Sequence, residues 1–323
     1  MSAQAPALRV FVLGATGTIG RATVAALLAR GHEVVCFVRP GSGPLPYAAS
    51  FRFGKVTDPA SLARDGFRSE RFDAIVSCLA SRTGAPLDAW AIDHQAHLQA
   101  LAAAQTAGVR QFVLVSAICV QRPKLAFQHA KLAFERALID SGLIYSIVRP
   151  TAYFKSLSGQ LNRVKAGKPF LLFGDGALTA CKPISDGDLG RYLADCLDDP
   201  HLQNRILPIG GPGPAITPRQ QGEALFRLLG LAPKFRRVPV RMLDGVIAVL
   251  DGLGRIAPRL KDKAELARIG RYYATESMLV FDAATGHYAA DATPATGSET
   301  LFDHYARLVR GAALDDRGAH AVF

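Results

Sequence analysis

The first half of the chain alternates short apolar runs with longer stretches of helical periodicity. Residues 8–13 (LRVFVL) are almost continuously apolar, which is typical of a strand buried on both faces of a parallel sheet. An Ala/Leu-rich helix is predicted over 21–30, closed by Gly31, because glycine favours the left-handed conformation that ends helices. Helical stretches near 87–107 and 123–141 follow later. Similar apolar runs predict five further strands, over 32–38, 51–56, 72–79, 111–118 and 145–150.

The pattern changes after Pro150. Loops rich in Gly, Pro and aromatic residues fill 151–180, ahead of a predicted helix over 186–197 and a strand over 205–210. A further helix is predicted from about Thr217. We therefore interpret the second half as a separate portion, part of which crosses back onto the sheet of the first half.

A glycine-rich loop joins the first predicted strand to the first helix. In strand–turn–helix context, Gly14 permits a tight turn, Gly17 lets the backbone approach a pyrophosphate, and Gly20 lets the helix pack close to the sheet. Amide groups at the start of the helix then face the phosphates. The loop predicts a dinucleotide site made by Gly14, Thr16, Gly17, Thr18, Ile19 and Gly20.

The end of the second strand indicates which dinucleotide is bound. Sites for NAD place Asp or Glu there against the ribose 2′-hydroxyl, whereas an arginine accommodates a 2′-phosphate. This strand ends at Arg39 with no carboxylate nearby, and a guanidinium pairs well with phosphate. The sequence therefore predicts NADPH as cofactor. Asp58, after the third strand, is expected near the adenine ring.

Strand–helix alternation and the glycine loop together predict an α/β fold. The expected architecture is a Rossmann-type doubly wound parallel sheet with a smaller, mostly C-terminal substrate-binding portion. We place an NADP-binding Rossmann domain at 1–150 and the substrate-binding portion at 151–323, with about 180–210 returning to the Rossmann sheet.

The most apolar segment of the chain lies at 238–256. Arg241, Asp244 and Asp251 interrupt it, so it does not qualify as a transmembrane span. Two interpretations remain open: an amphipathic helix packed on the core, or a helix that faces a membrane or a partner.

Composition and net charge limit the kinds of molecule that the chain is expected to bind. The formal net charge is +11, but the basic residues are spread along the chain, which favours an anionic substrate, cofactor or membrane surface over nucleic acid. The five cysteines form no C-x-x-C pair, so neither a disulfide framework nor a metal site is expected. The first residues lack the apolar segment of a signal peptide, which predicts a cytoplasmic chain. The sequence does not predict an oligomeric state.

The chemistry is indicated by a departure from a known pattern. Short-chain dehydrogenases place a serine after the fifth strand and a Tyr-x-x-x-Lys pair on the next helix, where tyrosine protonates a developing alkoxide. Here Ser116 and Lys131 are in register, but the tyrosine position holds Phe127. This disfavours carbonyl reduction and leaves hydride delivery to a carbon–carbon double bond. Lys131 is expected to orient the nicotinamide ribose, and His129 is a weaker candidate acid.

Several longer strings resemble one family. Residues 76–84 (VSCLASRTG), 116–135 (SAICVQRPKLAFQHAKLAFE), 145–160 (YSIVRPTAYFKSLSGQ), 173–185 and 269–279 (IGRYYATESML) are similar to divinyl chlorophyllide a 8-vinyl-reductases. The resemblance covers about 8–310. It implies an atypical, NADPH-dependent short-chain-fold reductase of chlorophyll or bacteriochlorophyll biosynthesis, acting on the 8-vinyl group of a 3,8-divinyl (proto)chlorophyllide.

Several aromatic and basic residues of the chain are consistent with a large, anionic hydride acceptor. Tyr153 and Phe154 offer flat apolar contact for a macrocycle, although both are equally compatible with a plain core. The substrate propionate has candidate partners among the basic residues, and the sequence does not choose among Lys155, Lys124, Arg122 and Lys182. We predict Tyr153, Phe154 and Lys155 as substrate-binding residues, and Lys131 as the catalytic residue.

Three rival functions remain at the level of sequence. Proteins of this fold that lack the catalytic tyrosine include non-catalytic NADP-binding sensors. An assembly protein for a photosynthetic complex would use the basic surface and the 238–256 helix at a membrane, and peripheral membrane contact stays open for the reductase too. An isoflavone-reductase-like alkene reductase with a phenolic substrate is the third.

Overall fold

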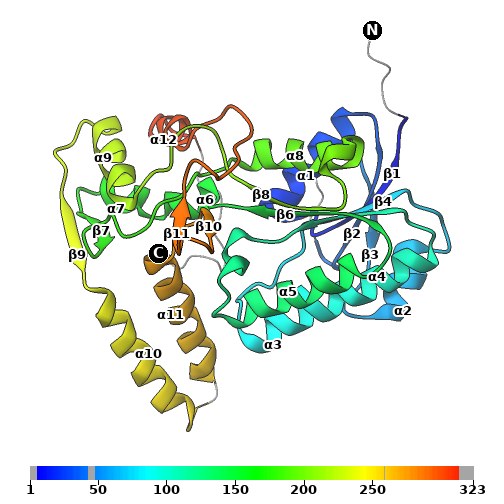
Figure 1. The fold of residues 1–323 in the computed structure, drawn as a ribbon, viewed down its shortest axis with the longest axis horizontal. Coiled ribbons are helices and arrows are strands. Elements are labelled where there is room, and N and C mark those ends of the chain that lie inside the picture. Colours follow the sequence, from blue (N-terminus) through cyan, green and yellow to red (C-terminus); the bar gives the residue numbers. More distant parts are fainter. Residues whose placement is uncertain (1–5, 43–47, 258, 313–323) are drawn as a thin grey trace.

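A seven-stranded, fully parallel sheet forms the centre of the first half of the molecule (Figure 1). The computed structural model describes residues 6–42, 48–257 and 259–312. In spatial order the strands are β3 (Ser50–Phe53), β2 (Glu33–Val38), β1 (Arg9–Leu13), β4 (Ala74–Ser77), β5 (Gln111–Val115), β6 (Ile144–Pro150) and β8 (Arg205–Ile209). The strand order reverses between β1 and β4, where ligands bind in folds of this kind. The predicted fold class and all seven strands of this sheet are confirmed.

Helices cover both faces of the sheet. On one face α1 (Thr18–Ala29) and α8 (Asp186–Asp198) enclose a core that includes Val12, Leu27 and Leu193. On the other face α4 (His97–Thr106) and α5 (Ala126–Ile139) pack around Phe112 and Phe134. Shorter helical turns complete this half: α2 (Pro59–Ser61), η1 (Leu62–Phe67), α3 (Pro86–Ala89), η2 (Trp90–Ala96), η3 (Ile118–Gln121) and η5 (Pro200–Leu202).

The chain leaves the sheet after β6 and returns to it through α8 and β8. Ser185 caps α8 by accepting a hydrogen bond from the amide of Asp188, as a serine before a helix does. Strand β8 then pairs in parallel with β6, with Val148 opposite Leu207. The helix over 186–197 and the strand over 205–210 are thus confirmed.

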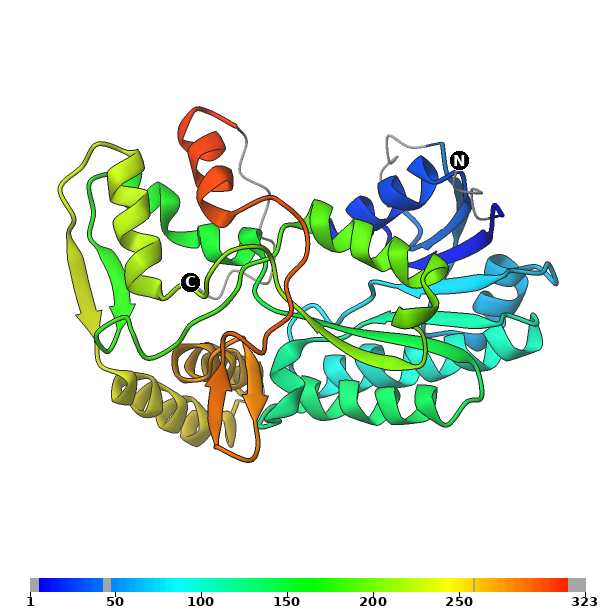
Figure 2. The same ribbon diagram turned by 45° about the horizontal axis from the view of Figure 1, so that its top comes forward.

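The second portion has its own core, beside the sheet (Figure 2). Its largest fully buried side chains are Phe154, Phe226 and Tyr305. Thr217 caps α9 in a reciprocal pair with Gln220, so the helix predicted from Thr217 is confirmed. Its elements are α6 (Phe154–Leu157), η4 (Ser158–Gln160), α7 (Leu161–Lys165), β7 (Phe170–Phe173), α9 (Pro218–Leu228), β9 (Phe235–Val238), α10 (Val240–Gly254), α11 (Arg259–Thr275), β10 (Val280–Asp282), β11 (His287–Ala289) and α12 (Leu301–Val309).

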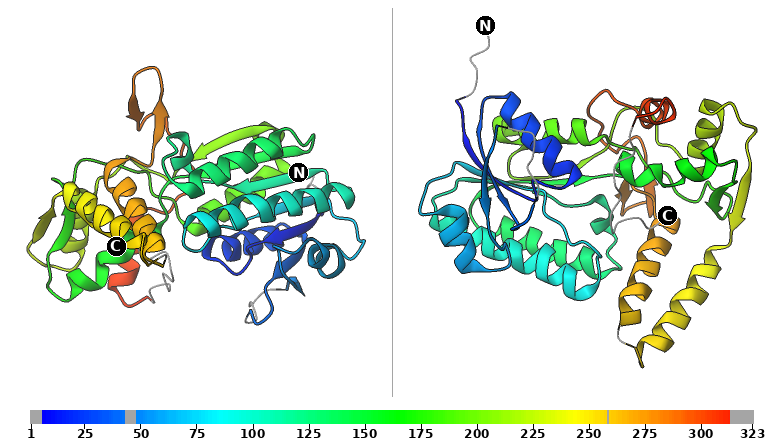
Figure 3. Two further views of the ribbon diagram at one scale, coloured as in Figure 1. Left: turned by 90° about the horizontal axis from the view of Figure 1, so that it is seen from below. Right: turned by 180° about the vertical axis from the view of Figure 1, so that it is seen from behind.

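Helices α10 and α11 form an antiparallel hairpin that extends away from both halves (Figures 1 and 3). Helix α10 is the apolar segment of the sequence, and the interpretation that it packs on the main core is wrong. Gly254 is its one buried residue among those described, and α11 is its main neighbour. Its outer face is apolar and exposed, through Met242, Val246, Val249 and Leu253. No helix within the described part of the chain is both long and apolar enough to cross a membrane.

Candidate functional site

The glycine loop between β1 and α1 makes a tight turn against the end of β4. Gly14 has a φ of +74°, and a Cβ there would lie 2.6 Å from the carbonyl carbon of Cys78. The amide of Gly17 donates to the carbonyl of Gly14 at 3.1 Å and closes the turn. A Cβ on Gly20 would lie 2.1 Å from the same carbonyl oxygen, so α1 approaches the loop as closely as glycine permits.

Gly17 shows why the loop fits a dinucleotide. Its φ is −73°, and a Cβ on it would meet only the Gly14 carbonyl oxygen, at 3.5 Å. Neither backbone strain nor crowding within the protein requires glycine here, whereas the close approach of a ligand to the backbone does. Gly17 caps α1 without a side-chain hydrogen bond, so amides of the first turn stay available to an anion.

Lys155 lies at this loop, although it comes from the second half of the chain. Its ammonium donates to the hydroxyl of Thr18 at 2.9 Å, and Thr18 is the first residue of α1. A cation at the start of the helix adds to the positive end of the helix dipole. We predict Lys155 from sequence as a substrate contact; its position favours the phosphates of the dinucleotide instead.

Arg39 and Asp58 follow β2 and β3, at the same edge of the sheet as the glycine loop. Arg39 is exposed, and no carboxylate among the described residues pairs with it. Asp58 accepts the amide of Ala60 at 3.0 Å and thereby caps α2. One carboxylate oxygen of Asp58 is thus engaged locally, and its place beside the adenine ring stays a prediction.

Lys131 is held by a carboxylate that sequence reasoning missed. Its ammonium lies 3.1 Å from Asp93 Oδ1, and the two residues are 8% and 1% exposed. Asp93 belongs to η2, a π-helical turn, and its second oxygen has no partner among the described residues. Helical periodicity gives no hint of this pairing. A buried lysine needs a negatively charged partner, but the sequence does not identify which acidic residue provides it.

Ser116 points toward α5 in this structure. Its hydroxyl donates to Glu135 Oε1 at 2.5 Å, and Arg149 forms an ion pair with the same carboxylate. Ser116 is 3% exposed. Its side chain is thereby committed to a buried network, and a contact with the cofactor stays a prediction.

Phe127 and His129 lie on different sides of α5. Phe127 is one turn before Lys131 and is half-buried against the second portion. His129 is two residues from Lys131, about 200° around the helix, and is exposed. His129 is therefore badly placed to protonate anything that Lys131 orients.

Tyr153 and Phe154 have separate surroundings despite being neighbours in sequence. Tyr153 lies near Cys78 and Cys119, and burial together with these thiols raises the pKa of its phenol. Phe154 is 1% exposed and packs in the second core, with its ring 5.4 Å from that of His304. The prediction of Phe154 as a substrate contact conflicts with this burial, because the ring is enclosed by protein.

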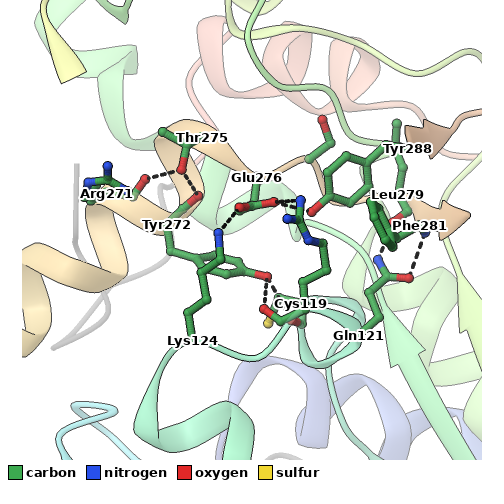
Figure 4. Close-up of polar contacts among 12 residues, drawn as sticks. Cys119, Gln121, Lys124, Arg271, Tyr272, Thr275, Glu276, Leu279, Phe281 and Tyr288 are labelled. Atoms are coloured by element: carbon green, nitrogen blue, oxygen red, sulfur yellow. Dashed lines mark hydrogen bonds and ion pairs between the residues drawn. The ribbon is translucent and has the colours of Figure 1, made fainter. Parts of the chain in front are cut away.

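The basic residues proposed for the propionate are largely engaged. Lys182 donates to the carbonyl of Thr293 at 2.9 Å. Arg122 lies 2.8 Å from Glu276, which also forms an ion pair with Lys124 (Figure 4). Burial raises the pKa of Glu276, but hydrogen bonds from Lys124 and Tyr288 and the two positive charges lower it overall. This cluster ties the end of α11 to the loop between β5 and α5.

Comparisons with known proteins agree with a nucleotide-binding fold. A family of NAD(P)H-binding domains matches residues 14–200. A solved structure described as AtPrR2 with NADP+ and (+)pinoresinol superposes with a TM-score of 0.69 at 18% identity, covering 94% of this chain and 99% of that one. At that identity the likeness shows the fold alone.

Two plant relatives are much closer in sequence. The divinyl chlorophyllide a 8-vinyl-reductase of Zea mays is 49% identical, over 97% of this chain and 82% of its own length. The protein of the same name from Arabidopsis thaliana is 46% identical, over 94% and 77%. With an NAD(P)H-binding domain and near-complete coverage at this identity, the chain belongs to the family of divinyl chlorophyllide a 8-vinyl-reductases.

Proposed function

We propose that this protein reduces the 8-vinyl group of a 3,8-divinyl (proto)chlorophyllide to an ethyl group with NADPH. The proposal rests on two residues of α5: Lys131 is present at the lysine position of the Tyr-x-x-x-Lys pattern, and Phe127 replaces the tyrosine. The chain is also 49% identical to a named reductase. The lysine that orients a nicotinamide ribose is present, and the phenol that serves carbonyl reduction is absent. This combination suits an alkene acceptor.

The binding roles follow from the site. Bound NADPH supplies the hydride. The loop at Gly17 and the ammonium of Lys155 hold the pyrophosphate, and Arg39 receives the 2′-phosphate. Asp93 keeps the Lys131 ammonium in place for the nicotinamide ribose. Much of the rate acceleration then comes from positioning the vinyl group.

The acceptor explains why an apolar residue suffices at Phe127. A vinyl group conjugated with a macrocycle spreads developing negative charge over the ring system, so no localised oxyanion forms at the reacting carbons. A phenol or another oxyanion donor at this position is unnecessary. Phe127 offers apolar contact instead, next to Ile269 of the second portion.

A spectroscopic assay tests the function. Purified protein is mixed with NADPH and divinyl chlorophyllide, and loss of the 8-vinyl group from conjugation is followed as a shift of the Soret band. We expect the shift with the wild type and its near-abolition in Lys131→Met. NADPH binding without any shift would support a sensor or assembly role, and turnover of phenolic alkenes alone would support the isoflavone-reductase-like alternative.

Peripheral contact with an anionic membrane is the second part of the proposal. The exposed stripe on α10 has the spacing of one helix face, since Met242, Val246, Val249 and Leu253 recur every three or four residues. Its two acids are paired, Asp251 with Arg268 and Asp244 with Arg271. Exposed basic residues on this segment are Arg236, Arg237, Arg241, Arg255, Arg259, Lys261 and Lys263. An apolar stripe among cations suits the surface of an anionic bilayer.

Vesicle flotation tests the membrane contact. We expect the wild type to float with vesicles containing phosphatidylglycerol, to float less with phosphatidylcholine alone, and to be released by salt. The double variant Val249→Asp, Leu253→Asp is expected to lose binding. Phe53→Asp, at an exposed phenylalanine on the far edge of the sheet, is the matched control. Equal flotation of all variants contradicts the proposal, as does self-association that the double variant abolishes.

A further inference from the structure

Reduction of a vinyl group needs a proton as well as a hydride, and Phe127 cannot supply one. We propose that the phenol of Tyr273, on α11, is the proton donor. The inference rests on the proposed reductase function and adds a catalytic residue to it. It places an acid from the second half of the chain where the first half lacks one.

The position of the Tyr273 hydroxyl supports this role. Its Oη lies 3.9 Å from Cys119 Sγ, in the turn that follows β5. Cys119 is also within electrostatic reach of Lys131 and Tyr153. The phenol therefore borders the group of residues that follow the carboxyl ends of the central strands, on the side of the nicotinamide-orienting lysine.

Helix α11 also packs close to Phe127, the residue at the position where short-chain dehydrogenases have the catalytic tyrosine. A Cβ on Gly84 would lie 2.8 Å from Ile269 Cδ1 and 3.6 Å from Phe127 Cδ1, so both side chains flank the same glycine. Ile269 is one turn before Tyr273 and shares its face of α11. The helix that carries the proposed acid is thus the one that meets Phe127.

The adjacent Tyr272 makes a useful contrast. Tyr272 is 4% exposed and donates to the carbonyls of Cys119 and Arg122, at 2.9 and 3.1 Å. Tyr273 is 37% exposed, and its hydroxyl contacts a thiol, which is a weak acceptor. The Tyr273 hydroxyl therefore has no strong acceptor that would hold its proton, and part of the residue remains exposed.

Electrostatics keep Tyr273 in its acid form. Loss of hydration at the hydroxyl, followed by the influence of Cys119 and Tyr153, raises its pKa well above the usual value. The phenol therefore remains protonated at neutral pH and is a strong enough acid only toward a carbanion, which is what hydride addition to the vinyl group generates. The ion-pair cluster of Glu276, three residues further on, fixes this end of α11.

The proton and electrons balance. The C=C π bond breaks, the terminal carbon gains the hydride that NADPH loses on becoming NADP+, and the adjacent carbon gains the proton of Tyr273 Oη. The phenolate then takes a proton from water. Other candidates are less suitable, because His129 faces away and Lys131 is paired with Asp93. Tyr153 is a nearby phenol that also needs an experimental comparison.

Three conservative variants test the proposal: Tyr273→Phe, Tyr153→Phe and Tyr272→Phe. We expect Tyr273→Phe to lower kcat by about 100-fold or more while the dissociation constant for NADPH, measured by fluorescence, is unchanged. Tyr272→Phe is expected to lower the melting temperature and to keep most of kcat. If Tyr153→Phe loses turnover and Tyr273→Phe keeps it, Tyr153 is the donor and the proposal is wrong.

A second measurement is independent of turnover. In protein labelled with 13C at tyrosine Cζ, the Tyr273 signal is assigned by its absence in Tyr273→Phe. We expect it to move when the 8-ethyl chlorophyllide product is added without cofactor, and the Tyr272 signal to stay. An unmoved Tyr273 signal at saturating product overturns the inference.

The two proposals fail in distinguishable ways. Wild-type protein that never reduces divinyl chlorophyllide contradicts the proposed function itself, and the inference falls with it. Wild-type turnover that Tyr273→Phe matches leaves the reductase function intact and contradicts only the role of Tyr273.

Discussion

In the proposed site, Arg39 and Lys155 divide the recognition of the dinucleotide between the two portions of the chain. Arg39 follows β2, and we propose that it contacts the 2′-phosphate, which distinguishes NADPH from NADH. Lys155 follows β6 and reaches Thr18, where we propose that the phosphates common to both dinucleotides bind. The two cations should therefore affect specificity and affinity separately.

Replacing Arg39 by Ala is expected to raise KM for NADPH by about tenfold or more and to leave KM for NADH nearly unchanged. The physical reason is the loss of a charge-assisted pair with the 2′-phosphate, a group that NADH lacks. Steady-state kinetics with both dinucleotides measure this. Arg136→Ala, at an exposed arginine on α5, is the control, and equal effects on both cofactors would show that Arg39 does not read the 2′-phosphate.

Replacing Lys155 by Met is expected to weaken NADPH and NADH alike, by about tenfold each, because the pyrophosphate is common to both. Fluorescence titration of the protein with each dinucleotide gives the two dissociation constants. Lys168→Met removes an exposed lysine of the same portion and should change neither. A selective loss of chlorophyllide binding in Lys155→Met would instead return this residue to the substrate.

At the scale of elements, the contact between α1 and α8 depends on a glycine. A Cβ on Gly190 would lie 2.6 Å from the backbone carbon of Ala22, so the two helices meet backbone to backbone. This contact lets α8 lie over α1, the helix whose first turn we assign to the phosphates of the dinucleotide. It therefore supports both the fold and the cofactor site.

We expect Gly190→Ala to lower the free energy of unfolding by about 1–3 kcal/mol, because the added methyl group must push the helices apart. Gly187→Ala is the matched control on the same helix. A Cβ there would meet only Arg191 Nη1 and Ser185 Oγ, at 3.5 and 3.9 Å, so this change should be neutral or slightly stabilising. Denaturant unfolding compares the two variants, and a similar loss in both would show that the close contact of Gly190 with Ala22 is not what the substitution disturbs.

The elements of the central sheet were predictable, because buried parallel strands are continuous apolar runs and the glycine loop marks the first turn. The short strands and the last helices of the second portion were not predicted. Which elements pack against each helix face could not be predicted. The apolar pattern of α10 predicts a helix, but only the fold reveals that α11 covers one face and leaves Val249 and Leu253 exposed. Likewise, Asp93 meets Lys131, and Lys155 meets Thr18, through proximity that no local pattern encodes.

At the scale of the whole molecule, a buried histidine makes stability depend on pH. His97 is 1% exposed; its Nε2 lies 2.8 Å from Ser77 Oγ and its Nδ1 2.8 Å from the carbonyl of Ile92. Burial, and then the charge of Lys131, lowers its pKa from 6.5 to about 4. Between these values the unfolded chain binds a proton that the folded protein does not.

Stability is therefore expected to fall as the pH decreases from about 6.5 to about 4, by up to about 3 kcal/mol from this group. Urea unfolding at a series of pH values measures it. His97→Gln should flatten this part of the profile whatever its effect on absolute stability, and His129→Gln, at an exposed site, should not. An unchanged profile in His97→Gln would assign the acid sensitivity to other groups.

The contact of Lys155 with Thr18 has a thermodynamic consequence. It joins the portion that we assign to the substrate directly to the turn that we assign to the cofactor, so we expect each ligand to alter the free energy with which the other binds. Such coupling is reciprocal: the factor by which NADP+ changes the affinity for chlorophyllide must equal the factor by which chlorophyllide changes the affinity for NADP+. Replacing Lys155 is therefore expected to reduce both factors by the same amount, whichever ligand is bound first.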